Sequence, residues 1–330
     1  MKIKKVIFLL SLIFIFTLTL SSCANETKEL DFYPLPDGTY GVKAGNAIYL
    51  DEIVIPSRYN GKPVTTILPE AFADAPNLTK ITIPDSITSI NYYAFYGCKN
   101  LESVVIPDSI TSIEKYAFTN CVKLTSIVIP DSVTSIGVSA FFGCTGLENI
   151  VMSHSLTSIE NSTFANCTSL TNVTIPDRVT SIGGSAFHGC TGLTNVIIPN
   201  SVASIGEGAF SHCISLVSIV IPDSVTSIGE WAFSNCSSLT SVVIGDSVTS
   251  IGGAAFKGCS RLTSVVIGDS VTSIGGSAFE GCSSLTSVEF KDPSVWYWLS
   301  HSISSSDLAN TSTAAQYLRS KYSGYTWTKK

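Results

Sequence analysis

The feature that most constrains this chain is a cysteine that recurs every 23 residues, nine times without a slip. A phenylalanine lies three residues before each cysteine and a leucine three residues after it. A fixed short period predicts a solenoid, in which every repeat is one rung that stacks on its neighbours. The nine cysteines are Cys98, Cys121, Cys144, Cys167, Cys190, Cys213, Cys236, Cys259 and Cys282.

One rung, residues 239–261, shows how each repeat is built. It begins with LxxVxI, the pattern of a short half-buried strand, and continues with a second short extended segment, VTSI. The last apolar residues stand at i, i+1 and i+4, a spacing that suits one helical turn with its apolar side inward. The predicted fold is therefore a repeat solenoid of mainly short parallel β-strands with one helical turn per rung. The inward positions are Leu239, Val242, Ile244, Val248, Ile251, Phe256 and Cys259.

The consensus LTSVVIPDSVTSIGxxAFxGC resembles the BspA-type, or treponemal-type, leucine-rich repeat of bacterial surface proteins. The resemblance covers about residues 38–291 and implies a leucine-rich-repeat-like fold. The ordinary LxxLxLxxN pattern is only partly present, because serine or another residue occupies the asparagine position (Ser86, Ser109, Ser132). The resemblance also implies an exported protein that binds host proteins or neighbouring cells.

The first residues have the features of an export signal. Three lysines precede an apolar run from Val6 to Leu20, which is short for a membrane span of about 20 residues. The run ends Leu-Ser-Ser-Cys, which resembles the lipobox of bacterial lipoproteins and implies that Cys23 is lipidated. Ala24 then permits sorting to the outer membrane. The alternative is an ordinary signal peptide in which Cys23 is incidental.

These features divide the chain into five predicted segments. We expect a lipoprotein signal peptide at 1–22, the lipidated Cys23 with a tether at 23–37, and an N-terminal cap with a first atypical rung at 38–77. The solenoid occupies 78–291 and an aromatic C-terminal cap 292–330. Within the N-terminal cap, Asn60-Gly61 predicts a hairpin turn, and Tyr40 with 47–50 is expected to form a meander. Three of the four tryptophans lie in the last segment, for which a sugar-stacking patch is the alternative.

The charge balance limits the partners. Without the three lysines of the signal peptide, 16 of the 19 basic residues remain against 25 acidic ones, a net charge of −9. An acidic surface repels phosphate backbones, so we expect no nucleic-acid partner.

The cysteine column, meaning the equivalent position in every rung, has three interpretations. Rungs about 4.8 Å apart would allow disulfides, and thiolates also bind metals. The odd number of cysteines and the lack of a CxxC or Cys/His zinc spacing favour buried free thiols instead. We therefore predict no metal and no cofactor.

An aspartate column follows the first strand. Each aspartate either caps the backbone N–H two residues further on, as an Asx-turn, or contributes to a row of cation sites. The turn is the favoured interpretation, because Asn200 and His154 interrupt the column. Its members are Asp85, Asp108, Asp131, Asp177, Asp223, Asp246 and Asp269.

One outward column of the first strand is apolar. Its composition reflects either β-propensity or an exposed stripe for partner binding on the concave sheet. Scattered aromatic residues, among them Tyr92, Tyr93, Tyr96, Tyr116 and Phe142, are further possible anchors. The predicted partner-binding residues are Val105, Val128, Val151, Ile197, Val220, Val243, Val266 and Trp231.

Together these features predict a lipid-anchored, adhesin-like scaffold in the bacterial envelope, exposed on the outer membrane. It would bind proteins or glycoproteins of a host or neighbouring cell, and a homodimer through the stripe is also possible. The alternative is a passive or antigenically variable coat protein. An enzyme is not expected, because repeated polar residues do not supply the unique constellation that catalysis requires.

Overall fold

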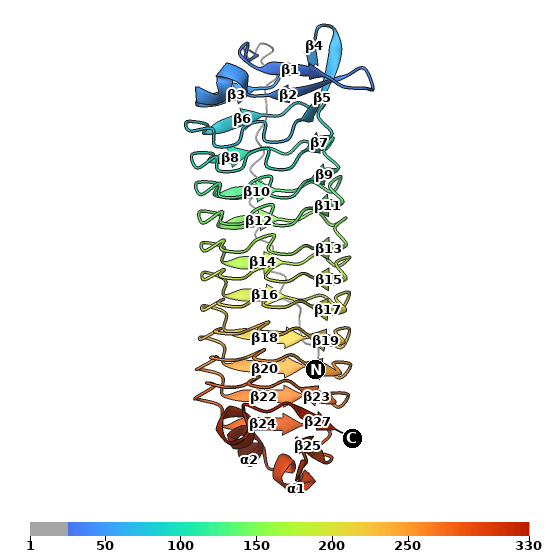
Figure 1. Ribbon diagram of the computed structural model, residues 1–330, viewed down its shortest axis with the longest axis vertical. Coiled ribbons are helices and arrows are strands. Elements are labelled where there is room, and N and C mark those ends of the chain that lie inside the picture. The colour runs from blue at the N-terminus through green and yellow to red at the C-terminus, as the bar shows by residue number, and fades with distance from the viewer. Residues whose placement is uncertain (1–25, 330) are drawn as a thin grey trace, which may run out of the picture.

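The computed structural model describes residues 26–329, which form a solenoid of short rungs stacked in one column (Figure 1). The predicted signal peptide and Cys23 lie outside the described residues. No helix within 26–329 has the length and apolar character needed to cross a membrane.

Each rung contributes two short strands, which in most rungs are separated by a Pro-Asp or Gly-Asp turn. The first strands and the second strands of the rungs each pair in parallel with their equivalents 23 residues further on. Ile205 thus lies opposite Ile228, and Val220 lies opposite Val243. The predicted parallel solenoid is confirmed. The first strands are β3 (Glu52–Val54), β6 (Lys80–Thr82), β8 (Ser103–Val104), β10 (Ser126–Val128), β12 (Asn149–Val151), β14 (Asn172–Thr174), β16 (Asn195–Ile197), β18 (Ser218–Ile221), β20 (Ser241–Ile244), β22 (Ser264–Ile267) and β24 (Ser287–Phe290).

The second strands form the longer ladders. They run through β5, β7, β9 and β11 and again from β13 to β23, whereas the first strands fall into four shorter sheets, β3-β6-β8, β10-β12, β14-β16 and β18-β20-β22-β24. The second strands are β5 (Lys62–Ile67), β7 (Ser89–Ile90), β9 (Ser112–Ile113), β11 (Ser135–Ile136), β13 (Ser158–Ile159), β15 (Ser181–Ile182), β17 (Ser204–Ile205), β19 (Ser227–Ile228), β21 (Ser250–Ile251) and β23 (Ser273–Ile274).

The segment expected to be one helical turn is a series of tight turns. In the rung of Phe95, the amides of Ala94, Tyr96 and Cys98 each donate to the carbonyl three residues earlier. The intervening amide of Phe95 donates instead to Ala117 in the next rung, at 2.7 Å. Hydrogen bonds within and between rungs thus alternate, and this alternation prevents a continuous helix.

The core consists of columns of identical side chains. Ten phenylalanines, from Phe72 to Phe279, are fully buried and stack on one another with ring centroids 5.0–5.6 Å apart and planes within 17°. Each buried cysteine is an unpaired thiol that donates to the phenylalanine carbonyl of the previous rung, as Cys98 does to Phe72 at 3.0 Å. The thiols therefore pack as small side chains with a satisfied donor.

The N-terminal end closes with an irregular sheet. β1 (Asp31–Pro34) pairs antiparallel with β2 (Tyr40–Lys43), and β4 (Arg58–Tyr59) forms the expected hairpin with β5 around Asn60 and Gly61. Two expectations were wrong. Residues 31–34 are a strand rather than tether, because their backbone pairs with β2, and Phe32 also stacks on Tyr59 with centroids 4.1 Å apart. Residues 47–49 belong to the 3₁₀-helix η1 (Gly45–Tyr49) rather than to a meander.

The C-terminal end is covered by residues 296–329, as the red elements at the base of Figure 1 show. β27 (Trp327–Lys329), β25 (Trp296–Trp298) and β26 (His301–Ile303) continue the second sheet beyond β23 in that order, each antiparallel to its neighbour. The α-helices α1 (Ser305–Ala309) and α2 (Thr311–Gln316) lead into the π-helical turn η2 (Tyr317–Lys321). Trp296 and Trp327 are buried, so these rings serve packing.

A glycine and an asparagine from successive rungs share one space. Gly143 has φ +69°, and a Cβ there would collide with the side-chain oxygen of Asn120 in the rung before. The same arrangement recurs between Asn166 and Gly189 and between Asn235 and Gly258. This shared space explains why glycine follows asparagine in these three pairs of rungs.

We predict that Gly143→Ala destabilises the protein for two separable reasons. Left-handed backbone costs a non-glycine residue about 1–2 kcal/mol, and the collision with Asn120 adds to that cost. In an Asn120→Gly background only the backbone cost remains. Urea unfolding of the two single variants and the double variant measures the coupling; strictly additive effects would contradict the shared-space explanation.

We also predict a loss of stability at alkaline pH that depends on the cysteines. Burial raises the pKa of Cys98, Cys190 and Cys236 from 9.0 to about 12. The stabilisation is complete below pH 9.0 and is lost progressively towards pH 12, since only the unfolded chain releases these protons. Each such thiol weakens the fold by up to about 1.4 kcal/mol per pH unit within that window.

The measurement is the urea midpoint at about pH 8 and about pH 10.5. The matched control is Cys190→Ala with Cys236→Ala, because Ala75 occupies the same column and is fully buried. The variant should lose less stability between the two pH values than the parent protein. An equal loss in both proteins would show that other groups, such as tyrosines, cause the pH dependence.

Candidate protein-interaction surface

The apolar column of the first strand lies on the surface. In β20, Val242 and Ile244 are buried while Val243 between them is 42% exposed. Exposure reaches 79% at Val105, and Val266 is half-buried. We call this row the apolar stripe, and its members are Val105, Val128, Val151, Ile197, Val220, Val243 and Val266.

The strand register brings members of the stripe next to one another. Val128 lies opposite Val151, and Val220, Val243 and Val266 are successive partners. Thr174 stands between Val151 and Ile197 in the column and Glu289 ends it. Adjacent rungs lie about 4.8 Å apart, so neighbouring stripe residues can contact a single partner together.

Neutral polar side chains flank the stripe on one side. The residue two positions before each stripe member points to the same face, and in the middle rungs it is an exposed serine or asparagine. An apolar centre beside a neutral polar margin is the usual composition of a protein–protein interface. These flanking residues are Ser126, Asn149, Asn172, Asn195 and Ser218.

Three shallow hollows adjoin the middle of the stripe, on its turn side. The first, of about 240 Å³, lies between Val151 and Pro176, where β12 and β14 are not paired. The next two, of about 510 and 300 Å³, follow beside Ile197 and Val220. The first and third hollows lie where the first-strand ladder is interrupted, and the second lies beside the paired strands β14 and β16.

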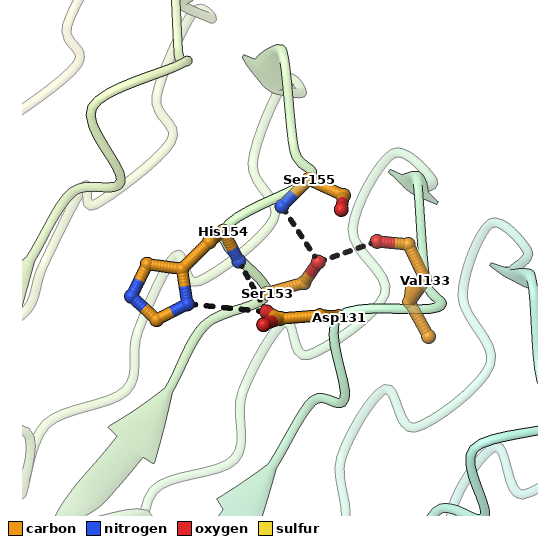
Figure 2. A network of polar contacts seen from close by, with 5 residues as sticks. All are labelled: Asp131, Val133, Ser153, His154 and Ser155. Atoms are coloured by element: carbon orange, nitrogen blue, oxygen red, sulfur yellow. Dashed lines mark hydrogen bonds and ion pairs between the residues drawn. The ribbon is translucent and has the colours of Figure 1, made fainter.

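Two members of the aspartate column bond to the next rung rather than within their own turn. Asp131 accepts a hydrogen bond from the backbone N–H of His154 at 2.8 Å (Figure 2). Asp223 accepts one from the backbone N–H of Asp246 at 2.8 Å. At these two positions the bond to the next rung takes the place of the expected Asx-turn, because stacking brings the next rung's amide to the carboxylate. The hydrogen bond from the His154 amide lowers the pKa of Asp131.

The rung of His154 lacks the usual proline, and a serine takes its place. The hydroxyl of Ser153 donates to the carbonyl of Val133 at 2.6 Å and accepts from the amide of Ser155 (Figure 2). The imidazole Nδ1 of His154 lies 3.1 Å from Asp131, but both side chains are highly exposed. An ion pair so exposed contributes little to stability, and we assign this group to turn structure.

Trp231 does not join the stripe. It lies in the turn after β19, with φ +52°, and is 46% exposed. The equivalent turns of two earlier rungs carry Tyr93 and Tyr116, which together with Tyr96 line one pocket of about 310 Å³. Sequence reasoning named these tyrosines as scattered anchors and missed their common site. The signal was that Tyr93 and Tyr116 share a column in adjacent rungs.

The repeat profile described as "BspA type Leucine rich repeat region" matches residues 65–194 and 180–308, in six copies. The chain belongs to this family. BspA-type proteins are repeat scaffolds, and the exposed stripe and hollows described above lie within the matched repeats.

Solved structures share the fold. A leucine-rich repeat protein from Bacteroides ovatus is 25% identical over 81% of this chain and 94% of its own, with a TM-score of 0.54. The pneumococcal vaccine antigen PcpA is 21% identical over 80% of each chain, with a TM-score of 0.55, and supports the fold alone. A search of curated protein sequences finds no match.

Proposed function

We propose that this protein is an adhesin-like binding scaffold on the bacterial surface, which engages a protein or glycoprotein of a host or neighbouring cell through the apolar stripe. The observation that carries the proposal is the exposure of six branched aliphatic side chains, between 42% and 79%, in one column. Contiguous apolar surface of this kind marks interaction sites in soluble domains.

The repeat does not require aliphatic residues in this column. Thr82, Thr174 and Glu289 occupy it in other rungs, whose strands form all the same. β-Propensity explains threonine as well as valine, but it does not explain why valine or isoleucine fills seven positions. A partner with a complementary apolar surface would explain why valine and isoleucine are preferred there.

The N-terminal sequence supports a proposal for attachment to the cell. We propose that Cys23 is lipidated and that the polar residues after it hold the solenoid at the outer membrane. Several acyl chains on one cysteine give stable anchoring, which a single chain does not. The acidic mature chain is repelled by anionic headgroups, so it would stand away from the membrane surface.

We predict that replacing Val128, Val220 and Val243 together with lysine abolishes partner binding. Burying unpaired ammonium groups in an apolar interface costs several kcal/mol, which corresponds to a loss of about two orders of magnitude or more in affinity. The measurement is saturable binding of the purified protein to a panel of extracellular-matrix glycoproteins and to host cells.

The matched control carries the same added charge elsewhere. Ser215, Ser238 and Ser284 are changed to lysine in a turn column that already holds Lys123 and Arg261. Binding should survive in this control while both variants keep the parent's circular dichroism and thermal unfolding. Binding that survives in the stripe variant would exclude the stripe as the site. Absence of any binding would favour a coat protein, and a dimer that the stripe variant dissociates would assign the stripe to self-association.

A further inference from the structure

The tyrosine pocket is a cavity away from the apolar stripe, and the proposed function does not use it. It lies among the turns that follow β7, β9 and β11, whereas the apolar stripe lies on the first strands. Its volume is about 310 Å³, at the lower end of the range of roughly 300–1,000 Å³ for ligand pockets. Its walls are Tyr93, Tyr96, Tyr116, Thr119, Asn120, Ser139 and Phe142.

The fold does not need tyrosine at these positions. Tyr93 and Tyr116 have φ of 58° and 61°, a left-handed conformation that is unfavourable for a bulky side chain. Six other rungs fill the same turn position with small residues and keep the same backbone. Those residues are Ser139, Ser162, Ser185, Gly208, Ala254 and Ser277.

The aromatic rings form a two-sided wall. Tyr93 and Tyr116 stack with centroids 4.7 Å apart and planes 11° apart. Tyr96 meets Tyr93 edge to face at 5.4 Å, and Tyr92 supports Tyr93 from outside at 6.1 Å. Because the tyrosines pack against one another, their rings are held in place in the pocket wall.

The polar groups around the rings are neutral. The hydroxyl of Thr119 is engaged, since it donates to the carbonyl of Ser139 at 2.6 Å. Within residues 26–329, no hydrogen bond involves the hydroxyls of Tyr93, Tyr96 or Tyr116 or the side-chain nitrogen of Asn120. None of the lining residues is charged. The pocket therefore offers apolar aromatic surface beside free neutral donors and acceptors.

We infer that the tyrosine pocket binds a neutral saccharide. A sugar ring has C–H faces that pack on aromatic rings, and its hydroxyl groups pair with amides and phenols at the rim. An aliphatic peptide side chain would leave the tyrosine hydroxyls and the Asn120 amide without partners. A charged ligand would find no counter-ion. The site goes beyond the proposed protein-binding function, because it occupies a different face and has a different ligand chemistry.

The test is a printed array of neutral oligosaccharides probed with the purified protein, followed by calorimetric titration of each saccharide that binds. The test variant is Tyr93→Ser with Tyr116→Ser, which installs the residue that four other rungs carry at this turn. The control is Trp231→Ser, which removes an aromatic residue from the same column outside the pocket. Affinity should fall by about tenfold or more in the test variant and stay unchanged in the control.

Two further variants test the pocket independently of the double serine variant. Asn120→Gly removes the amide at a left-handed position that glycine occupies in other rungs, and it should weaken saccharide binding even if the double serine variant is misfolded. The lysine variant of the apolar stripe should bind saccharide normally, which separates this site from the proposed function. Absence of any neutral saccharide ligand, equal binding by the pocket variants, or displacement by aromatic peptides alone would each overturn the inference.

Discussion

Backbone hydrogen bonds between neighbouring rungs are the constraint on which the rest of this structure depends. The amides of Phe95, Phe118 and Phe141 each donate to the carbonyl 22 residues further on, at 2.7–2.9 Å. A residue inserted within a stacked segment would break these bonds and displace the buried side chains of that rung, whereas the extra residues between β3 and β5 are accommodated as the β4–β5 hairpin outside the stack. The period therefore stays fixed at 23 residues, whereas surface side chains are free to change. Stability in such an array accumulates from one rung to the next.

This constraint distinguishes positions whose side chains are fixed by packing from positions whose side chains are free to serve a function. The buried columns repeat almost without variation because each rung is the packing surface of the next. The outward column of the first strand has no such partner, and its aliphatic residues are consequently informative about function. The turn column of Tyr93 and Tyr116 is an intermediate case. Its backbone is fixed by stacking, but its side chains are not. Bulky rings at a left-handed position therefore indicate a functional role in addition to the structural one.

The repeated part of the fold could be predicted from sequence because every position is seen nine times. Strand direction, inward columns and the exposure of the stripe all follow from that redundancy. The ends occur once, and the prediction was less complete there: the hairpin at Asn60-Gly61 was expected, but β1 was expected to be tether, although its backbone pairs with β2. The tyrosine pocket also escaped prediction. Tyr96 and Phe142 are 46 positions apart in the sequence, and only the stacking of the rungs brings them into one pocket.

The two candidate surfaces differ in how they depend on the repeat. The apolar stripe consists of one aliphatic side chain from each of seven rungs, and each contributes a small part of the contact surface. A partner can therefore lose one contact and keep the others. The tyrosine pocket is assembled once, from rings that support one another, so the loss of Tyr93 also removes the support of Tyr116. Removing a single residue should therefore matter little at the stripe and greatly in the pocket. A repeat scaffold can in this way combine a tolerant, extended contact surface with one specific pocket on the same rigid frame.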